Sequence, residues 1–227
     1  MKLVIIGATG GVGRHLVAQG LRRGHSLTLL VRPQSAAAEQ PGVRLLQGSL
    51  EDAGAVDAAF EGAEAVLSCI GMQRRNPANP WSESLSPEDL TSATARLIVD
   101  GMRRQRVPRL VAVSAAGVGD SAARLNLVMR FFLATTMIGT AYRDLARMED
   151  VYAASGLDWV TPRPTRLTNG APAKALQVVE SFGAADAICR ADVARWMLDA
   201  LEQPTWPAPG WGSRTPQISS GGSPARP

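Results

Sequence analysis

Cysteine, histidine and lysine each occur only twice in this chain of 227 residues. The two cysteines, Cys69 and Cys189, lie in apolar surroundings without metal-binding spacing, so we expect reduced, buried thiols and no metal site. His15 and His25 fall on a predicted helix and just after it, and we expect structural or surface roles for both. Reduced thiols are typical of the cytoplasm, which is the location we expect.

Long apolar runs and basic blocks are also missing. The most apolar stretch, Leu125–Met137, is too short to span a membrane and contains Arg130. Because the chain starts on a strand-like run, we expect no signal peptide. The net charge of +4 comes mostly from arginine, in separated pairs such as Arg22–Arg23 and Arg103–Arg104 with no interleaved aromatic residues. We therefore expect neither a membrane nor a nucleic acid as partner.

What the chain does have is an ordinary globular composition, with 45% apolar and 19% charged residues. The apolar pattern continues without a pause over residues 1–203, which predicts one domain. From Pro204 the composition shifts to proline, glycine and serine, so residues 204–227 are expected to be largely disordered, although Trp206 and Trp211 could dock locally.

Strand-like and helix-like segments alternate along the domain. The predicted strands are Lys2–Ile6, Ser26–Val31, Val43–Gln47, Ala65–Ile70, Arg109–Ser114 and Leu157–Thr161. The predicted helices are Gly13–Gly24, Glu51–Phe60, a segment from an N-cap at Ser86 to about Gln105, Ala141–Ser155 and Ala191–Leu201. This alternation predicts an α/β fold, a Rossmann-like doubly wound parallel sheet with helices on both faces.

The first strand runs directly into a glycine-rich turn, Gly7-Ala8-Thr9-Gly10-Gly11-Val12-Gly13. In a doubly wound sheet this is the place where ligands bind. Gly7 would make the sharp turn, Gly10 would admit a diphosphate close to the backbone, and Gly13 would let the helix pack on the sheet. Thr9, Gly11 and Val12 complete the candidate cofactor-binding loop, whose free amides and helix dipole favour phosphate. The alternative is a tight turn without a ligand.

Six segments together resemble one superfamily. They are the glycine loop, "LLVR" at Leu29–Arg32, "VAVSAAG" at Val111–Gly117, "SGLDWV" at Ser155–Val160, "RPTRLTNG" ending at Gly170 and "CRADVAR" at Cys189–Arg195. The chain resembles the short-chain dehydrogenase/reductase superfamily, in particular its atypical NmrA-like and flavin-reductase-like branch. The resemblance covers roughly residues 1–203 and implies a dinucleotide cofactor without naming a substrate.

The end of the second strand distinguishes the two nicotinamide cofactors. It carries Arg32 and no acid before Glu39, so we favour NADP(H), whose 2′-phosphate an arginine can bind, over NAD(H). The alternative is a surface arginine. The resemblance implies further cofactor contacts, although the family's usual aspartate after the third strand is replaced by serine. These contacts are Ser49 and Leu50 near the adenine, Cys69, Ile70 and Gly71 near the nicotinamide-side ribose, and Ser114 and Pro164.

The Tyr-x-x-x-Lys pair of catalytic short-chain reductases is missing. Ala146 follows four residues after Tyr142, and Gly156 four residues after Tyr152. Tyr142 is therefore a weak candidate for a proton donor. Ser114 is the other catalytic candidate, because the resemblance places a serine here beside the nicotinamide, but it could equally satisfy the backbone at a strand end.

Two functions are compatible with these observations. The first is an NADP(H)-dependent oxidoreductase that transfers a hydride to a small planar or carbonyl acceptor, with a small-molecule substrate. The alternative is a non-catalytic NADP(H) sensor that acts through a protein partner, and a homodimer is a further possibility. The apolar segment Ala122–Thr140 is interpreted as a lid over the nicotinamide, a core helix or a subunit contact, with the loop Gly71–Leu85 as another wall of the site.

Overall fold

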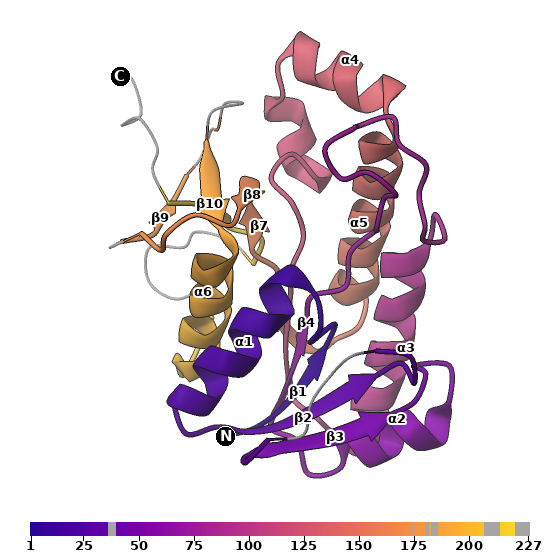
Figure 1. Ribbon diagram of the computed structural model, residues 1–227, viewed down its shortest axis with the longest axis vertical. Helices are drawn as coiled ribbons and strands as arrows, with labels where there is room; N and C mark the ends of the chain where they lie inside the picture. The colour runs from indigo at the N-terminus through magenta and orange to yellow at the C-terminus, as the bar shows by residue number, and fades with distance from the viewer. Residues whose placement is uncertain (36–39, 174, 180–181, 183–185, 207–213, 221–227) are drawn as a thin grey trace.

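The computed structural model describes residues 1–35, 40–173, 175–179, 182, 186–206 and 214–220 (Figure 1). Its strands are β1 (Lys2–Ile6), β2 (Ser26–Val31), β3 (Val43–Gln47), β4 (Ala65–Ser68), β5 (Arg109–Ala112), β6 (Asp158–Val160), β7 (Arg163–Pro164), β8 (Arg166–Thr168), β9 (Gln177–Val178), β10 (Ala187–Cys189) and β11 (Gln217–Ser219). Its helices are α1 (Gly11–Arg22), α2 (Ala53–Phe60), α3 (Leu90–Gln105), the 3-10 helix η1 (Gly119–Arg124), α4 (Leu127–Thr135), α5 (Met137–Ala153) and α6 (Arg190–Glu202).

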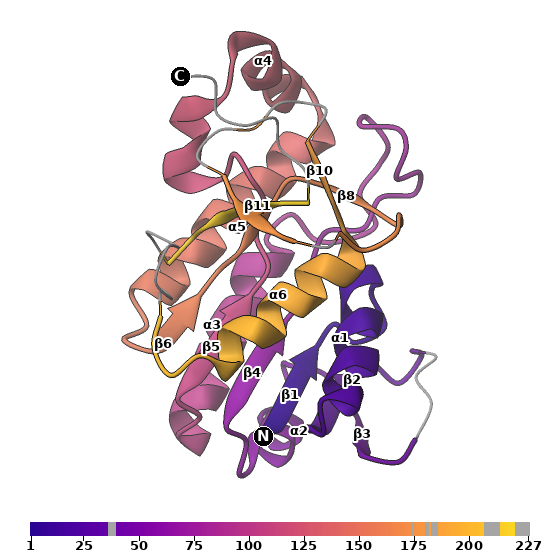
Figure 2. The same ribbon diagram turned by 90° about the vertical axis from the view of Figure 1, so that its left-hand side faces the viewer.

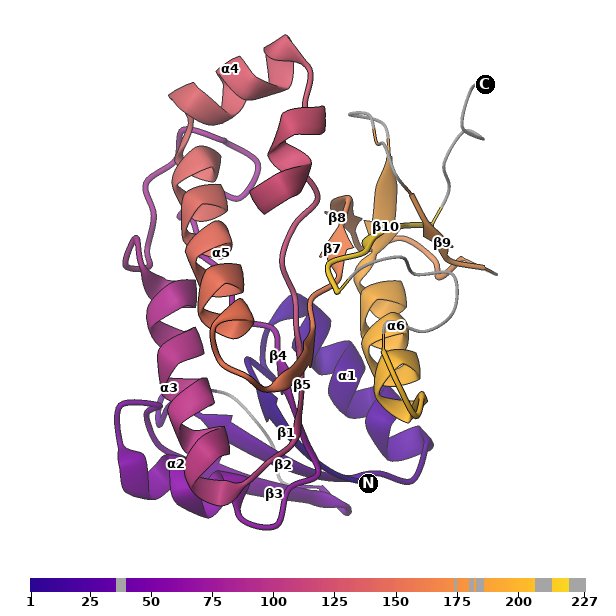
Figure 3. The same ribbon diagram turned by 180° about the vertical axis from the view of Figure 1, so that it is seen from behind.

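Six parallel strands form the central sheet in the order β3-β2-β1-β4-β5-β6. Helices α1 and α6 cover one face, and α2, α3 and α5 cover the other (Figures 1 and 3). This confirms the predicted Rossmann-like doubly wound fold. The strand order reverses between β1 and β4, so the crevice at their carboxyl ends is the expected ligand site.

The alternation of side chains along β1 explains the two layers of core. Leu3 and Ile5 point into the cluster beneath α1 and α6, whereas Val4 and Ile6 point into the cluster beneath α2, α3 and α5. All four are at most 2% exposed. A strand buried on both faces has to be apolar at every position, as the continuous run at the N-terminus predicted.

Helix α3 begins later than predicted, and Ser86 is not its N-cap. The helix starts at Leu90, and the N-cap position is Asp89, whose side chain makes no capping bond. The buried carboxylate of Asp144 on α5 takes that role instead, since its Oδ2 accepts bonds from the Thr91 amide at 2.6 Å and the Thr91 hydroxyl at 2.5 Å. The start of α3 is thus stabilised by a residue 53 positions away in the chain.

After residue 203 the structure describes residues 204–206 and 214–220, and both stretches pack on the rest of the chain, including Trp206, whose local docking was expected. Trp206 is only 7% exposed, and its indole nitrogen donates to Asp158 Oδ1 at 2.5 Å. Strand β11 is buried and pairs with β7 in parallel and with β9 in antiparallel orientation. The tail gains structure because it packs on distant parts of the chain, which composition does not reveal. Trp211 lies outside the described residues.

The apolar segment between β5 and α5 stands away from the sheet. Helix α4 lies at the end of α5 farthest from the sheet (Figures 1 and 3). None of its described side chains is buried, and Leu127, Val128 and Phe131 are 71–81% exposed. A core helix is therefore the wrong interpretation, and the lid and the subunit contact remain. Trp81, from the loop 71–85, packs edge-on against Phe132.

Two expected absences can be compared with the described part of the chain. There, no helix combines the length and apolar character that crossing a bilayer requires. Within the same residues, no group of three or more histidine, cysteine or acidic side chains is placed to hold a metal ion. Cys69 and Cys189 are both free thiols.

Candidate active site

The glycine loop turns the chain sharply at the end of β1. Gly7 has a φ of +83°, in the left-handed region that favours glycine, and a Cβ there would lie 3.0 Å from the Cys69 carbonyl group. The amide of Gly10 donates to the Gly7 oxygen at 3.0 Å, which closes the turn. A Cβ at Gly13 would overlap the same Gly7 oxygen, so only glycine lets α1 approach the strand this closely.

The first turn of α1 leaves its amide groups open to a ligand. Gly10 is the N-cap residue and has no side chain to cap the helix. The amides of Gly11, Val12 and Gly13 have no partner within the helix, because a helix leaves its first N–H groups unpaired. These donors, together with the helix dipole and the missing Cβ atoms, fit a diphosphate.

The ends of β2 and β3 lie at the side of the crevice where we expect the adenosine of the cofactor. Arg32 follows β2, is exposed and forms no ion pair with any described residue. The Gly48 amide donates to the Val31 oxygen at 2.9 Å, which carries the pairing of these strands up to Arg32 and Ser49. Ser49 is exposed and its hydroxyl accepts from the Glu51 amide at 3.2 Å, while Leu50 packs against the core.

Cys69, Ile70 and Gly71 lie where the ends of β4 and β1 meet. The Cys69 amide donates to the Ile6 oxygen at 2.9 Å, so the two strand ends stay together beside Gly7. Burial raises the pKa of the Cys69 thiol to about 12, which keeps it protonated at neutral pH. We therefore assign Cys69 a role in lining the site rather than in nucleophilic chemistry.

Ser114 follows β5 and is 5% exposed. Its backbone amide donates to the Pro162 oxygen at 3.0 Å, and the Ala116 amide donates to the Pro164 oxygen at 2.9 Å, so Ser114 and Pro164 lie on adjoining segments. The Ser114 hydroxyl is buried and has no hydrogen-bond partner in the described part of the molecule. A buried hydroxyl without a partner is costly, and a ligand atom would satisfy it. This removes the purely backbone-capping interpretation of Ser114.

Tyr142 lies on α5 and is half-buried. Its burial raises the pKa of the phenol above the ordinary value, the opposite of what a proton donor with a lysine neighbour needs. Arg147 lies one helical turn beyond Arg143 on the same helix. Its guanidinium pairs with the Asp144 carboxylate at 3.3 Å. The structure thus places Ser114 beside the crevice, and no described residue activates Tyr142.

The family comparison follows from this geometry. A family model described as NAD(P)H-binding matches residues 7–204, from the first glycine of the loop to the end of the last helix. The chain belongs to this NAD(P)H-binding family. The match includes every segment that forms the crevice. The glycine loop, the open amides at the start of α1 and the unsatisfied Ser114 hydroxyl all fit a dinucleotide.

Among characterised relatives of this NAD(P)H-binding protein is the isoflavone reductase homolog IRL of Zea mays. It is 39% identical over 80 residues, and the match covers 31% of this chain and 26% of the relative, so this chain spans about a quarter of that protein.

Two solved structures share the fold. The anaerobillin reductase ChuY of Escherichia coli is 22% identical with a TM-score of 0.77 and 97% coverage of both chains. A short-chain dehydrogenase/reductase of Veillonella parvula, in complex with NADP, is 18% identical with a TM-score of 0.73, covering 99% and 95% of the two chains.

Sequence reasoning missed a buried ion-pair network behind the crevice. Arg163 on β7 is 4% exposed, and Glu149 on α5 accepts from its Nε at 2.9 Å and from its Nη2 at 2.5 Å. Asp120, in η1, accepts from Nη1 at 2.5 Å. The network ties the segment after Ser114 to α5 and β7. No local sequence pattern marks it, because its members are 14 and 43 positions apart.

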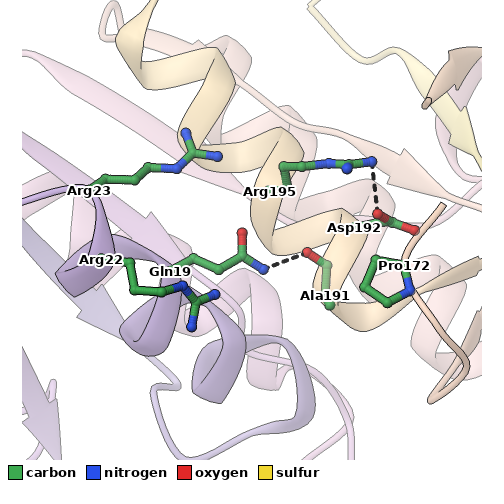
Figure 4. Close-up of a pocket in the computed structure, with 7 residues that line it drawn as sticks. All are labelled: Gln19, Arg22, Arg23, Pro172, Ala191, Asp192 and Arg195. Carbon is green, nitrogen blue, oxygen red and sulfur yellow. Dashed lines mark hydrogen bonds and ion pairs between the residues drawn. The ribbon is translucent and has the colours of Figure 1, made fainter. Parts of the chain in front are cut away.

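A hollow of about 300 Å³ lies elsewhere, between the second half of α1 and the start of α6 (Figure 4). It is lined by Gln19, Arg22, Arg23, Pro172, Ala191, Asp192 and Arg195. Arg23 pairs with Asp199 and Glu202, and Arg195 pairs with Asp192, so acids neutralise most of its positive charge. Its position along α1 separates it from the glycine loop, and we do not assign the cofactor to it.

Proposed function

We propose that this NAD(P)H-binding protein is an NADP(H)-dependent reductase that transfers a hydride to a small planar or carbonyl acceptor. The observation that carries the proposal is Arg32, an exposed guanidinium at the end of β2 that pairs with none of the acids the structure describes. The adenosine ribose of a nicotinamide cofactor lies at this point in a doubly wound fold. In NADP(H) that ribose carries the 2′-phosphate, for which a guanidinium is a strong partner. The NADP complex of the Veillonella parvula neighbour agrees with this choice.

Each part of the crevice has a separate task in this proposal. The amides of Gly11 and Val12 hold the diphosphate, and Arg32 holds the 2′-phosphate. When bound, NADPH supplies the hydride, and the acceptor takes its proton from solvent. The unsatisfied hydroxyl of Ser114 donates a hydrogen bond to an oxygen of the hydride acceptor and so orients the acceptor. This task needs no change in the protonation of Ser114. Tyr142 is assigned no proton transfer, because burial raises the pKa of its phenol.

A planar acceptor agrees with the absence of a Tyr-x-x-x-Lys pair, because a flavin-like or quinone-like molecule needs no positioned side-chain acid. The structural neighbour that reduces anaerobillin and the relative named for isoflavone reductase both point to reductase chemistry. We therefore propose a planar or carbonyl acceptor, and a panel of such compounds can identify the individual substrate.

The second candidate is an NADP(H) sensor that acts through a protein partner. The missing catalytic pair favours it, as do Leu127, Val128 and Phe131, which expose an apolar surface on α4. A sensor would bind NADP⁺ and NADPH with different affinities and would reduce no acceptor.

Cofactor preference is tested by titrating the protein with NADPH and NADH and recording nicotinamide fluorescence. Arg32→Asp should weaken NADPH binding by about 10- to 100-fold and change NADH binding little, since only NADPH carries the 2′-phosphate. Arg44→Asp is the matched control, because Arg44 is also an exposed arginine, on the neighbouring strand β3. Equal losses for both cofactors would contradict the assignment of Arg32.

Catalysis is tested by supplying NADPH with flavin, quinone, aldehyde and anaerobillin acceptors in turn and following absorbance at the nicotinamide band. Turnover of any acceptor that falls in Ser114→Ala, with NADPH affinity unchanged, supports the reductase. Tight binding of NADPH without turnover, together with a different affinity for NADP⁺, favours the sensor.

A further inference from the structure

Arg190 lies directly above the glycine loop. It is the first residue of α6, which packs beside α1 (Figure 2). A Cβ built on Gly11 would meet the Cδ and Nε atoms of Arg190 at 2.7 Å. The arginine side chain therefore occupies the space that any other residue at position 11 would fill, beside the open amides of the first turn of α1.

Within the described part of the chain, Arg190 contacts a neutral group and no acid. Its Nη1 donates to Asn169 Oδ1 at 2.7 Å, a neutral amide oxygen, and none of the described acids forms an ion pair with it. A cation at the first position of a helix such as α6 is also disfavoured by the helix dipole. The described residues thus give the charge of Arg190 little stabilisation.

The surroundings of Arg190 are positive as well. The N-terminus of α1 carries the positive end of its dipole, and Arg14 is held on the loop by a bond from its Nε to the Thr9 oxygen at 2.9 Å. Two guanidinium groups and a helix N-terminus converge on one loop. Such an arrangement is stabilised by a bound anion, and the diphosphate of the cofactor is the anion this loop fits.

We propose that Arg190 is a diphosphate-binding residue that closes over the cofactor from the side opposite the amides of α1. Its planar guanidinium can donate to two phosphate oxygens at once, and Asn169 holds it ready beside the loop. Gly11 has a second role in this arrangement, because the absence of a side chain gives Arg190 its place. The inference rests on dinucleotide binding and not on the choice of NADP(H) over NAD(H).

The first test is calorimetric titration of Arg190→Gln. Binding of NADPH and of NADH should weaken alike, by about 10- to 100-fold, because both carry the diphosphate. Binding of adenosine 2′-phosphate, which has no diphosphate, should be unchanged. Arg166→Gln is the control, since Arg166 is exposed on the nearby strand β8 and should leave all three affinities unaltered. Unchanged NADPH affinity in Arg190→Gln would overturn the proposal.

A double-mutant cycle with Gly11→Ala separates a direct contact from a structural effect. The new methyl group should displace Arg190 and weaken NADPH binding several-fold, while in the Arg190→Gln background the same change should have little further effect. The melting temperature without ligand should not fall in Arg190→Gln, because the substitution removes a cation from a helix N-terminus, where the helix dipole disfavours it. Independent, additive losses, or a marked fall in melting temperature, would contradict the direct role.

These outcomes are distinct from a failure of the proposed function. A wild-type protein that prefers NADH would contradict the role of Arg32 and leave the equal losses caused by Arg190→Gln intact. Selective loss of NADPH alone in Arg190→Gln would assign Arg190 to the 2′-phosphate and overturn the diphosphate proposal.

Discussion

The ion-pair network of Arg163 offers a stringent test of the structure, because two acids contact the same guanidinium at very different depths. Glu149 has a side-chain exposure of 8%, and Asp120 one of 77%. Their shortest contacts with Arg163 are both 2.5 Å. The two pairs thus differ in burial and in the number of hydrogen bonds, since Glu149 accepts two from Arg163 and Asp120 accepts one.

Removing Glu149 leaves a buried guanidinium without its two-fold partner. Loss of one member of a buried pair costs about 3–5 kcal/mol, and the remaining contact with Asp120 places Glu149→Ala near the lower limit, about 3 kcal/mol. Asp120→Ala should cost no more than about 1 kcal/mol, because an exposed pair is largely screened by water. With a urea slope of about 2 kcal/mol/M, the unfolding midpoint should fall by roughly 1.5 M in Glu149→Ala and by at most about 0.5 M in Asp120→Ala.

The assay is equilibrium unfolding in urea, followed by tryptophan fluorescence and by circular dichroism. Coincidence of the two probes establishes that a single free energy of unfolding applies. The double variant Glu149→Leu with Arg163→Met should recover most of the lost stability, because neither charge is then left buried. Equal effects of Glu149→Ala and Asp120→Ala would refute the argument from burial.

Three further predictions follow from the fold and the site. Asp144→Ala should destabilise the protein by about 2 kcal/mol at pH 7. Burial alone would raise the pKa of Asp144, but bonds from the start of α3 outweigh it and lower the pKa; its contribution is therefore present above about pH 4 and should fade on further acidification, as urea unfolding at pH 7 and pH 3 would show. Gly13→Ala should lower the melting temperature without ligand, whereas Gly10→Val should remain folded and abolish NADPH binding, and the reverse pattern would contradict the roles given to these glycines. Tyr142→Phe should leave the rate of acceptor reduction within about twofold, and a loss near the 10²-fold expected of a general acid would restore Tyr142 as proton donor.

The features that could be predicted from the sequence are those with a local pattern. All six strands of the central sheet were predicted, because each is a short apolar run and a buried parallel strand has to be apolar on both faces. The glycine loop could be placed because its spacing, the preceding strand and the following helix all lie within residues 2–22. The positions of Arg32 and Ser114 after strand ends were also predicted, whereas their roles stay predictions.

The features that were missed depend on contacts between distant residues. The start of α3 is set by Asp144 on another helix, which no capping pattern near Ser86 could reveal. Strands β7 and β9 have only two residues, too few for any periodicity to be recognised. Arg190 reaches Gly11 across 179 positions of sequence, so its place above the loop appears only in three dimensions.

The segment after residue 203 has a consequence for self-association. Strand β6 is an edge of the six-stranded sheet, and an open edge can pair with the edge of another molecule. Here Arg214 donates to the Trp159 oxygen at 2.7 Å, and the Thr161 amide donates to the Arg214 oxygen at 2.8 Å. These contacts occupy backbone groups that a neighbouring strand would otherwise use. A segment whose composition suggests a passive tail therefore covers this edge of the sheet, and another molecule could pair with β6 only by displacing it.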